Sequence, residues 1–424
     1  MKKIRERINP TRKAIHRRIF YNCCLALAFF IPISGRVLPP IIMLMVLNWL
    51  IEGSYLRNAK ELLQRSSRKN IFLFSVFYFL YLVGMTYSEN QDYGWFDLEI
   101  KFSLLLFPLI FSTMDISMEW KQVTMVLKAF VAGCLSGTLI LVGHSAYLHF
   151  AEGVKDAFAY TNLSWLFHPS YLSMYLSFSI AILILALIEH WELHSVKLRR
   201  GMISMITWFF VFIIFLSSKA GFIGLFTVII VSSLILAFKY RKLRHALGII
   251  ILSVLLFIGG LKIFPFASTR VIEAKQDITG NLSGSVHGNS TADRIGIWKA
   301  GGKIVQRNLF FGVGTGDVKD ELVKEYKNDD VHPAFELRLN AHDQYLQTMI
   351  ALGIPGLITL LLSLFLPLVS ALKQDYYLYV IFLLVFMTNI LVEAMLEIQQ
   401  GVIYYAFFNT FLFWSMSLKP KDNK

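Results

Sequence analysis

A histidine and an aspartate stand side by side at the start of a long apolar stretch. The segment NAHDQYLQTMIALGIPG runs from Asn340 to Gly356, with His342 and Asp343 in its polar first half and few polar residues from Leu346 onward. Histidine readily takes and releases a proton near neutral pH, and it often serves as a general base. His342 is therefore the first candidate for catalysis, and Asp343 either orients the imidazole or caps the following helix.

Further polar residues stand at the ends of other apolar stretches. Lys219 lies in LSSKAG, His168 lies in FHPSYLSMY, and Glu393 and Glu397 lie in EAMLEIQQG. A charge near membrane hydrocarbon is costly, about 2.5–3.5 kcal/mol at a helix centre, so charges grouped at one depth favour a polar cavity there. The alternative is that each residue lies in a wet interfacial turn, which explains the residues singly but not their grouping.

Arg294 lies in GNSTADRIGIWKAGG, a segment with the signature of a helix start. Ser290 and Asp293 fit the S-x-x-D capping pattern, and Trp298 follows Arg294 by about one helical turn. A guanidinium beside the free N–H groups of a helix N-terminus can bind phosphate, because both supply donors and positive potential. The alternative is an arginine on a solvated loop helix.

Alternating glycines follow in GVGTG, at positions 312 to 316. Such a segment could let backbone N–H groups approach an anion, but glycines in this arrangement more often mark a tight turn. The strand–helix–strand pattern of a dinucleotide-binding motif is missing around them. Both the anion-binding and the tight-turn interpretations stay open at this point.

The composition decides the class of protein. The chain of 424 residues is 56% hydrophobic, contains 36 phenylalanines and has a mean hydropathy of +0.57. A soluble domain of this length does not tolerate such a composition, whereas a bundle of lipid-exposed helices requires it. The net charge of +13 lies mainly in loops between apolar segments, which argues against a nucleic-acid partner.

About twelve apolar segments are long enough to cross a membrane, given the roughly 20 residues that a spanning helix needs. Cys23, Cys24 and Cys134 fall within these segments, so we expect no disulfide and no cysteine metal site. The sequence therefore predicts an all-α polytopic membrane protein. The predicted helices lie near 19–35, 37–52, 70–87, 99–114, 123–149, 169–189, 202–217, 219–238, 247–264, 343–370, 376–394 and 400–418.

Lysines and arginines in the connecting segments predict the orientation. Runs such as MKKIRERINPTRKAIHRR, LRNAKELLQRSSRK and KYRKLR alternate with short connections that are poor in basic residues. By the positive-inside rule both termini are cytoplasmic, and the basic N-terminus is typical of an uncleaved signal anchor. We expect nine helices in residues 1–264, one large extracytoplasmic loop at 265–341, and three helices with a cytoplasmic tail in residues 342–424.

Several segments together resemble the O-antigen ligase and O-antigen polymerase superfamily of bacterial polysaccharide assembly. They are RIGIW, GVGTG and AHDQYLQTMIALGIPG, with LSSKAG, HPSY and EAMLEIQQGVIYYAFF as further similar segments. The family signature is an outer-loop arginine with a tryptophan four residues on. A His-Asn-type pair of residues follows, then nine residues and Gly-x-x-Gly. Two positions depart from it: Asp343 stands where ligases carry Asn, Ser or Gln, and Lys219 stands where the family carries arginine.

The resemblance implies a membrane glycosyltransferase of the C type that needs no metal or cofactor. Such an enzyme takes glycan from undecaprenyl-pyrophosphate on the periplasmic side of the bacterial inner membrane and passes it, with inversion, to an acceptor hydroxyl. The acceptor is lipid A–core for a ligase and a second carrier-linked glycan for a polymerase. His342 would be the general base, and Arg294 and Lys219 would bind the pyrophosphate. Further substrate-binding candidates are His168, Asp343 and Glu393.

Other functions compete with this one. A lipid flippase or transporter would also have many helices and a polar cavity, but transporters usually carry charges near the membrane midplane. A purely structural membrane protein gives no reason for the interfacial charges. Another glycosyltransferase family uses acidic residues in a large first outer loop with a divalent metal, whereas SGRVLPP at 34–40 has no carboxylate. Within the superfamily, the Gly-x-x-Gly motif and the single large loop favour ligase over polymerase.

Overall fold

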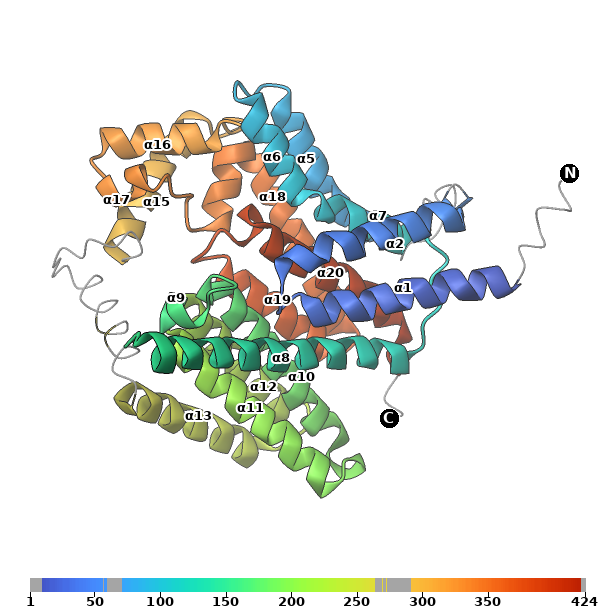
Figure 1. The fold of residues 1–424 in the computed structure, drawn as a ribbon. Coiled ribbons are helices and arrows are strands. Elements are labelled where there is room, and N and C mark those ends of the chain that lie inside the picture. Colours follow the sequence, from blue (N-terminus) through green and yellow to red (C-terminus); the bar gives the residue numbers. More distant parts are fainter. Residues whose placement is uncertain are drawn as a thin grey trace, which may run out of the picture.

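The structure of the chain is a computed structural model that describes residues 10–55, 57–58, 71–263, 269, 272 and 291–420. Helices joined by turns make up the described part, which contains no β-strand, so the all-α prediction is confirmed (Figure 1). The helices are α1 (Pro10–Phe30), α2 (Leu38–Glu52), α5 (Val76–Met85), α6 (Gln91–Lys101), α7 (Ser103–Thr113), α8 (Trp120–Glu152), α9 (Tyr160–Leu163), α10 (Pro169–His190), α11 (Val196–Leu216), α12 (Lys219–Phe238), α13 (Leu243–Ile263), α15 (Thr291–Arg307), α16 (Val318–Asn328), α17 (His332–Glu336), α18 (Gln344–Lys373), α19 (Tyr377–Asn389) and α20 (Gln399–Ser415).

Seven helical segments in the described ranges are long and apolar enough to cross a membrane, which confirms a polytopic membrane protein. The number of twelve is not supported by this criterion, although a helix overlaps each of the predicted segments. The helices α5, α7 and α19 have only 10 to 13 residues. At 1.5 Å per residue they are shorter than the roughly 30 Å hydrocarbon core. The seven segments are Gly35–Glu52, Trp120–Glu152, Pro169–Leu193, Val196–Leu216, Lys219–Phe238, Leu243–Ile263 and Gln344–Lys373.

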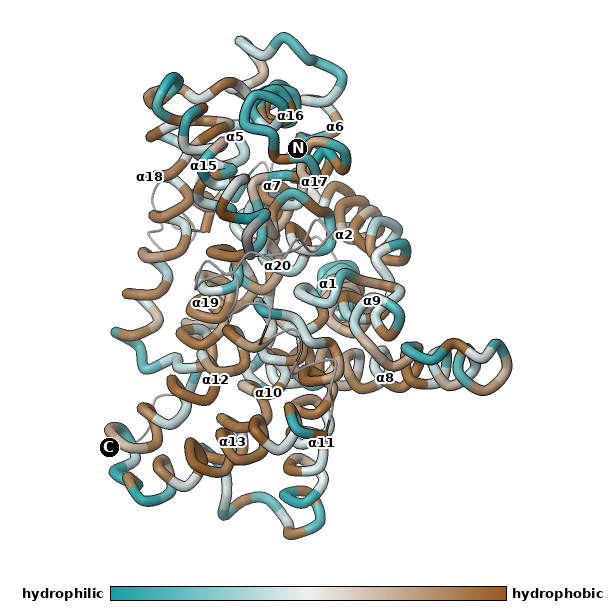
Figure 2. Tube along the Cα trace, turned by 90° about the vertical axis from the view of Figure 1, so that its left-hand side faces the viewer, coloured by the Kyte–Doolittle hydropathy of each residue, from teal (hydrophilic) through white to brown (hydrophobic). Residues whose placement is uncertain are grey.

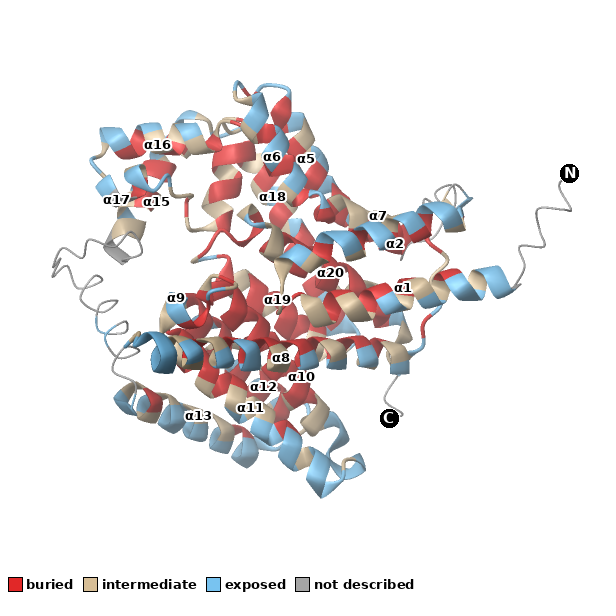
Figure 3. Ribbon diagram, viewed as in Figure 1, coloured by how far each residue is buried: buried red, intermediate tan, exposed pale blue. Residues whose placement is uncertain are grey.

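The core of the bundle is aromatic. Rings from α8, α10 and α20 form a continuous set of contacts with centroid separations of 4.7 to 6.3 Å. Buried residues gather along α10, α12 and α19 (Figure 3), whereas α13 is strongly hydrophobic but exposed (Figure 2). Apolar helix faces that point outward suit contact with lipid. The central rings belong to Phe130, Tyr175, Phe178, Tyr404 and Phe408.

Part of the predicted outer loop packs against a kink in α18. The kink lies at Gly353, whose φ of +61° is left-handed, and a Cβ there would collide with the backbone of Leu309 and Phe310. Beside the kink, the Ile354 N–H donates to the carbonyl oxygen of Leu309 at 3.0 Å. Glycine is required here because it alone combines the left-handed backbone with so close an approach. The loop is therefore anchored on a long apolar helix.

The glycines of GVGTG are part of this packing. The N–H groups of Gly312, Gly314 and Gly316 all donate hydrogen bonds within the chain, so they are not directed at a ligand. For these residues the tight-turn interpretation is supported and the anion-binding one is wrong. Their acceptors, at 2.9 to 3.0 Å, are the carbonyl oxygens of Asn308 and Ala351 and the hydroxyl of Ser88.

Candidate functional site

The turn between α19 and α20 carries a buried carboxylate that binds two predicted site residues. Glu393 accepts a hydrogen bond from Arg294 Nη2 at 2.7 Å through Oε1, and His342 Nδ1 lies 3.2 Å from its Oε2. Arg294 also donates from Nη1 to the carbonyl oxygen of Val392 at 2.6 Å. Residues that are 51 and 99 positions away from Glu393 in the sequence therefore meet at one carboxylate.

Glu393 is ionised at neutral pH despite its burial. Its side chain is 8% exposed, and burial by itself raises the pKa of a carboxyl group. The hydrogen bond from His342 and the charge of Arg294 outweigh burial and lower the pKa of Glu393 to about 2. His168 acts in the same direction, so its imidazole is within electrostatic reach. A charged carboxylate in this position can orient and stabilise a protonated imidazole.

His342 belongs to a short strap, residues 340–343, whose backbone is held by side chains. The φ of His342 is +47°, a left-handed value that few non-glycine residues adopt. Its N–H donates to Asn340 Oδ1 at 3.0 Å, and the N–H of Ala341 donates to the buried Gln347 Oε1 at 3.0 Å. The strap thus presents the imidazole from a strained backbone that its neighbours maintain.

The helix α15 binds both halves of the site. Trp298 Nε1–H donates to the carbonyl oxygen of Ala341 in the strap at 3.1 Å. Arg294 lies one turn earlier on the same face of α15 and donates to Glu393. The Arg-x-x-x-Trp spacing therefore has a physical reason, since one helix face fixes the strap relative to the carboxylate. The predicted cap residue Ser290 lies outside the described residues.

One nitrogen of His342 is left for chemistry. Nδ1 faces an ionised carboxylate, which only accepts, so we assign the proton of the neutral ring to Nδ1 and the basic lone pair to Nε2. Nε2 is buried and has no hydrogen-bond partner among the described residues, and the same holds for Arg294 Nε. Because buried polar atoms are nearly always paired, these two atoms indicate where a ligand or water binds.

Asp343 caps α18. Its Oδ1 accepts a hydrogen bond from the N–H of Leu346 at 2.9 Å, and its extended backbone is that of an N-cap residue. Burial raises the pKa of Asp343, although the backbone hydrogen bonds oppose this shift. Of the two roles predicted for Asp343 beside the histidine, the structure contains the cap, and the carboxylate bound to the imidazole is Glu393.

Two more predicted residues reach the site through a pair of serines that were not predicted. Ser170 Oγ lies 3.4 Å from Glu393 Oε1 and 3.1 Å from Ser218 Oγ. His168 is the N-cap residue of α10, and Lys219 follows Ser218 as the first residue of α12. The N-termini of α10 and α12 therefore converge near the carboxylate and add positive potential there. Ser170 stands in HPSY and Ser218 stands in LSSKAG, and these two motifs were the sequence signal that could have identified the serines.

The second outer glutamate belongs to another cluster, which sequence reasoning missed. Glu397 Oε2 lies 3.1 Å from Lys101 Nζ, and the same ammonium lies 2.5 Å from Asp97 Oδ1. Gln344 Nε2 donates to Glu397 Oε1 at 3.1 Å, and Gln344 Oε1 accepts from the N–H of Leu396 at 2.7 Å. Asp97 and Lys101 stand four residues apart, the spacing of an ion pair on one helix face, and this spacing was the sequence signal for the cluster.

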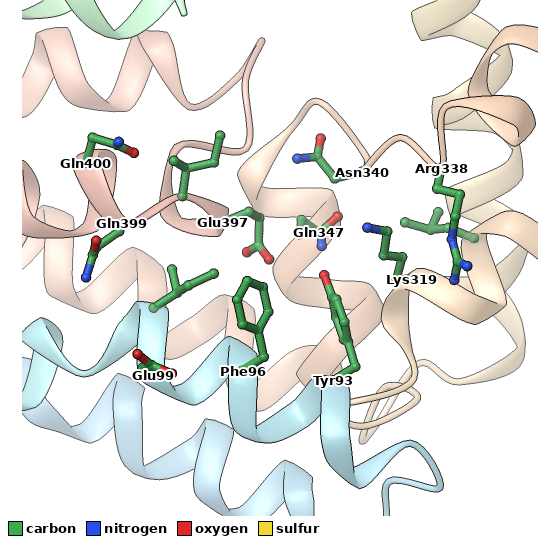
Figure 4. A pocket seen from close by; sticks show the side chains of 13 residues that line it. Tyr93, Phe96, Glu99, Lys319, Arg338, Asn340, Gln347, Glu397, Gln399 and Gln400 are labelled. Atoms are coloured by element: carbon green, nitrogen blue, oxygen red, sulfur yellow. The ribbon is translucent and has the colours of Figure 1, made fainter. Parts of the chain in front are cut away.

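A cavity of about 470 Å³ opens beside the strap, between α6 and the segments 338–347 and 397–400 (Figure 4). Asn340 and Gln347 form part of its wall and also hold the strap, whereas His342 is not among the lining residues. Of the charged residues from which a polar cavity was predicted, Glu397 lines this one, and its other walls come from segments that no motif pointed to. The remaining lining residues are Tyr93, Phe96, Glu99, Ile100, Lys319, Leu322, Arg338, Glu397, Ile398, Gln399 and Gln400.

Metal ligands do not gather in the part of the chain that the structure describes. No group of three or more His, Cys, Asp or Glu side chains in that part is arranged to hold an ion. The three cysteines are buried and unpaired. Metal-free chemistry stays a prediction that only an activity assay can test.

Comparison with known proteins supports the resemblance seen in the motifs. Residues 203–361 match the family described as O-Antigen ligase, which confirms the predicted resemblance to this superfamily. The matched stretch contains Lys219, Arg294, His342 and Asp343, whereas His168 and Glu393 lie outside it. No curated protein matches the chain.

Proposed function

Because residues 203–361 carry the O-antigen ligase domain, we propose that the chain is a membrane glycosyltransferase of the bacterial inner membrane. It transfers glycan from undecaprenyl-pyrophosphate to a hydroxyl of lipid A–core on the periplasmic side. The observation that carries the proposal is the binding of Arg294 and His342 to Glu393, which leaves a buried basic nitrogen unpaired.

The proposed step is a single displacement at the anomeric carbon. His342 Nε2 takes the proton of the acceptor hydroxyl as the new carbon–oxygen bond forms. The bond from the anomeric carbon to the phosphate oxygen breaks on the opposite face, and its electron pair leaves with undecaprenyl-pyrophosphate. Glu393 holds the imidazole through Nδ1 and stabilises the imidazolium that forms. Inversion follows because no side chain attacks the sugar.

Positive groups around Glu393 would receive the leaving pyrophosphate. Arg294 keeps Nε unpaired, and Lys219 stands at the N-terminus of α12. Charge on the phosphate oxygens grows as the sugar–phosphate bond breaks, so fixed cations stabilise the transition state more than the ground state. Lysine lacks the two-pronged grip of arginine, so Arg294 carries the larger share. We assign His168 and Asp343 to substrate binding and not to proton transfer.

The reaction requires these groups on the periplasmic side. We retain twelve spans with cytoplasmic termini, membrane helices in 1–264 and 342–424, and a periplasmic loop at 265–341, which the alternation of basic loops supports. A cysteine at the exposed Lys324 should react with an impermeant maleimide in intact spheroplasts. A cysteine at the exposed Lys197 should react only after lysis. The reverse pattern would overturn the orientation.

Transfer by the purified protein from an undecaprenyl-pyrophosphate glycan to lipid A–core tests the proposal. Arg294→Ala should nearly abolish transfer, and Arg294→Lys should lose most of it, whereas Lys219→Arg should be tolerated. Arg307→Ala on the same helix is the matched control, since this arginine is 55% exposed and pairs with Glu325. Equal activity of Arg294→Ala and Arg307→Ala would place the pyrophosphate elsewhere.

Envelope glycolipids of a deletion strain distinguish ligase from polymerase. Loss of a ligase leaves bare core and accumulates carrier-linked polymer. Loss of a polymerase leaves core that bears a single repeat, and that profile would replace lipid A–core by a second carrier-linked glycan as the acceptor. An unchanged profile would contradict both reactions.

A further inference from the structure

The cavity beside the strap has the mixed lining of a saccharide site. Tyr93 and Phe96 of α6 present aromatic rings to it, and the Phe96 side chain is 57% exposed (Figure 4). Amides of Asn340 and Gln347 face them from the other wall. Sugar rings offer apolar C–H faces to aromatic groups and hydroxyls to amides, so this lining matches both kinds of surface. The volume of about 470 Å³ lies in the range that ligand pockets occupy.

One end of the cavity is cationic. Lys319 Nζ lies 5.6 Å from the centroid of the Tyr93 ring and forms no ion pair with a described carboxylate. Arg338 donates from Nη2 to Asp320 at 2.8 Å, which leaves its other donors available. An anionic substituent at this end of the cavity would therefore meet one unpaired ammonium and part of a guanidinium.

The carboxylates of the lining do not cancel this positive end. Glu397 shares the buried Lys101 with Asp97, at 3.1 and 2.5 Å, so its charge is partly compensated. Glu99 lies at the other end of the cavity from Lys319 and Arg338 (Figure 4). The cavity is thus polarised along its length, with hydroxyl-binding groups at the Glu99 end and cations at the Lys319 end.

The cavity lies close to the reacting groups without containing them. Its wall residues Asn340 and Gln347 accept hydrogen bonds from the backbone N–H groups of His342 and Ala341, respectively. An occupant of the cavity would therefore lie against the residues that hold the strap. The proposed transfer residues Arg294 and His342 lie within the matched stretch 203–361, whereas α6 and residues 397–400 lie outside it. The matched stretch therefore supplies the cations Lys319 and Arg338 of the lining, and the aromatic rings of α6 come from outside it.

We propose that this cavity binds an anionic saccharide, a sugar that carries a carboxylate or phosphate, as the glycan part of one of the two substrates. The ring stacks on Phe96 and Tyr93, and its negative group lies between Lys319 and Arg338. The identification of the saccharide as part of a substrate rests on the proposed function. The binding of the saccharide itself does not depend on that function.

Calorimetry on the full-length purified protein tests the proposal. It measures the affinity for digalacturonic acid and for the methyl ester of this acid. The acid should bind about fivefold more tightly than the ester, in which neutral methyl ester groups replace the charged carboxylates. Lys319→Gln should reduce this difference, because Arg338 alone then meets the negative group, and Phe96→Ala should weaken both ligands about fivefold. The matched controls are Lys324→Gln, on the same helix but 68% exposed, and Trp95→Ala, which stands beside Phe96 outside the lining.

Absence of binding to the unaltered protein, or equal affinities for acid and ester, would overturn the anionic-saccharide site. Equal effects of Lys319→Gln and Lys324→Gln would do the same. In the transfer assay, a raised KM for acceptor or for donor in Lys319→Gln identifies which glycan occupies the cavity, and unchanged constants contradict a substrate role. Binding of the acid by the unaltered protein without any glycan transfer would count against the proposed function alone.

Discussion

Glu393 and Glu397 stand four residues apart in the turn between α19 and α20, yet the two carboxylates organise different surroundings. Glu397 shares the fully buried Lys101 with Asp97, and one ammonium between two carboxylates leaves each charged group paired. Glu393 binds Arg294 and His342, but this second cluster leaves one nitrogen of each partner without a hydrogen bond among the described residues.

The comparison separates charged groups that stabilise the fold from charged groups that can still bind a substrate. A buried ion cluster whose polar atoms are all paired has no capacity left for a substrate, and it fixes the backbone that carries it. A cluster with unpaired buried atoms retains that capacity at a cost in stability. On this basis we propose that Glu397 positions the turn and that Glu393 takes part in the proposed reaction.

His342→Ala tests the strongest half of the comparison. It should lower transfer from an undecaprenyl-pyrophosphate glycan by about 10²–10⁴-fold, because a general base typically contributes that factor. Protein level and carrier-lipid binding should stay near normal. The measurement is the initial rate of transfer in vitro, repeated with a chelator. Full activity of the variant would make His342 a structural residue, and loss of parental activity on chelation would replace the metal-free mechanism.

Glu393→Gln should lower transfer by about 10–100-fold, since a group that orients a catalytic residue typically has effects of this size. It also has a pH signature. The folded-state pKa of Glu393, about 2, is below its ordinary value of 4.5, so its contribution is complete above about pH 4.5 and lost as the pH falls towards 2. The difference corresponds to about 3 kcal/mol.

The stability deficit of Glu393→Gln relative to the parent should therefore shrink between pH 5 and pH 3. Denaturant unfolding in detergent at several pH values measures it. A deficit that stays constant over this interval would mean that the carboxylate is not held ionised by Arg294 and His342, and the comparison between the two glutamates would lose its electrostatic basis.

Lys101→Met tests the structural half. It should destabilise the protein by about 3–5 kcal/mol, because it leaves two buried carboxylates facing each other, while the transfer rate per folded molecule changes less than in Glu393→Gln. The triple variant Asp97→Asn, Lys101→Met, Glu397→Gln should recover most of the loss, since no charge is then unpaired. Thermal unfolding in detergent measures both. If Lys101→Met were as inactive as His342→Ala but as stable as the parent, the assignment of the Glu397 cluster to a structural role would be contradicted.

Asp343 should give the smallest effect. Asn caps a helix about as well as Asp, so Asp343→Asn should leave transfer and stability nearly unchanged, whereas Asp343→Ala should cost about 0.5–2 kcal/mol of stability. Parallel rate and unfolding measurements on the two variants check this. A strong loss of transfer in Asp343→Asn would indicate that its charge, and not its cap, is needed beside His342.

The sequence predicted what depends on local signals. Segment 169–189 became α10 at Pro169–His190, and the break at SSKAG became the turn between α11 and α12, because hydropathy and turn residues act over a few positions. Arg294 and His342 were found through motif spacing. The pairing of Glu393 with both residues was not predicted, because it depends on the packing of segments 51 and 99 residues apart.

Other features could not be predicted for the same reason. The polar stretch before Lys101 was assigned to a connection, yet residues 91–101 form α6, whose start contacts the far segment that includes Asp317. Its burial comes from tertiary contacts and not from its own periodicity. The cavity likewise requires the simultaneous placement of Tyr93, Lys319 and Gln399, which no single segment encodes.

The position of Glu393 near the end of the chain has a consequence for biosynthesis. Ribosomes add about 5–20 residues per second, so Arg294 is made roughly 5–20 s before its partner 99 residues later. During that interval the arginine has no carboxylate and the histidine has nothing to orient it. By the proposed mechanism, a nascent chain that has already inserted α18 should transfer glycan only after the turn between α19 and α20 is in place.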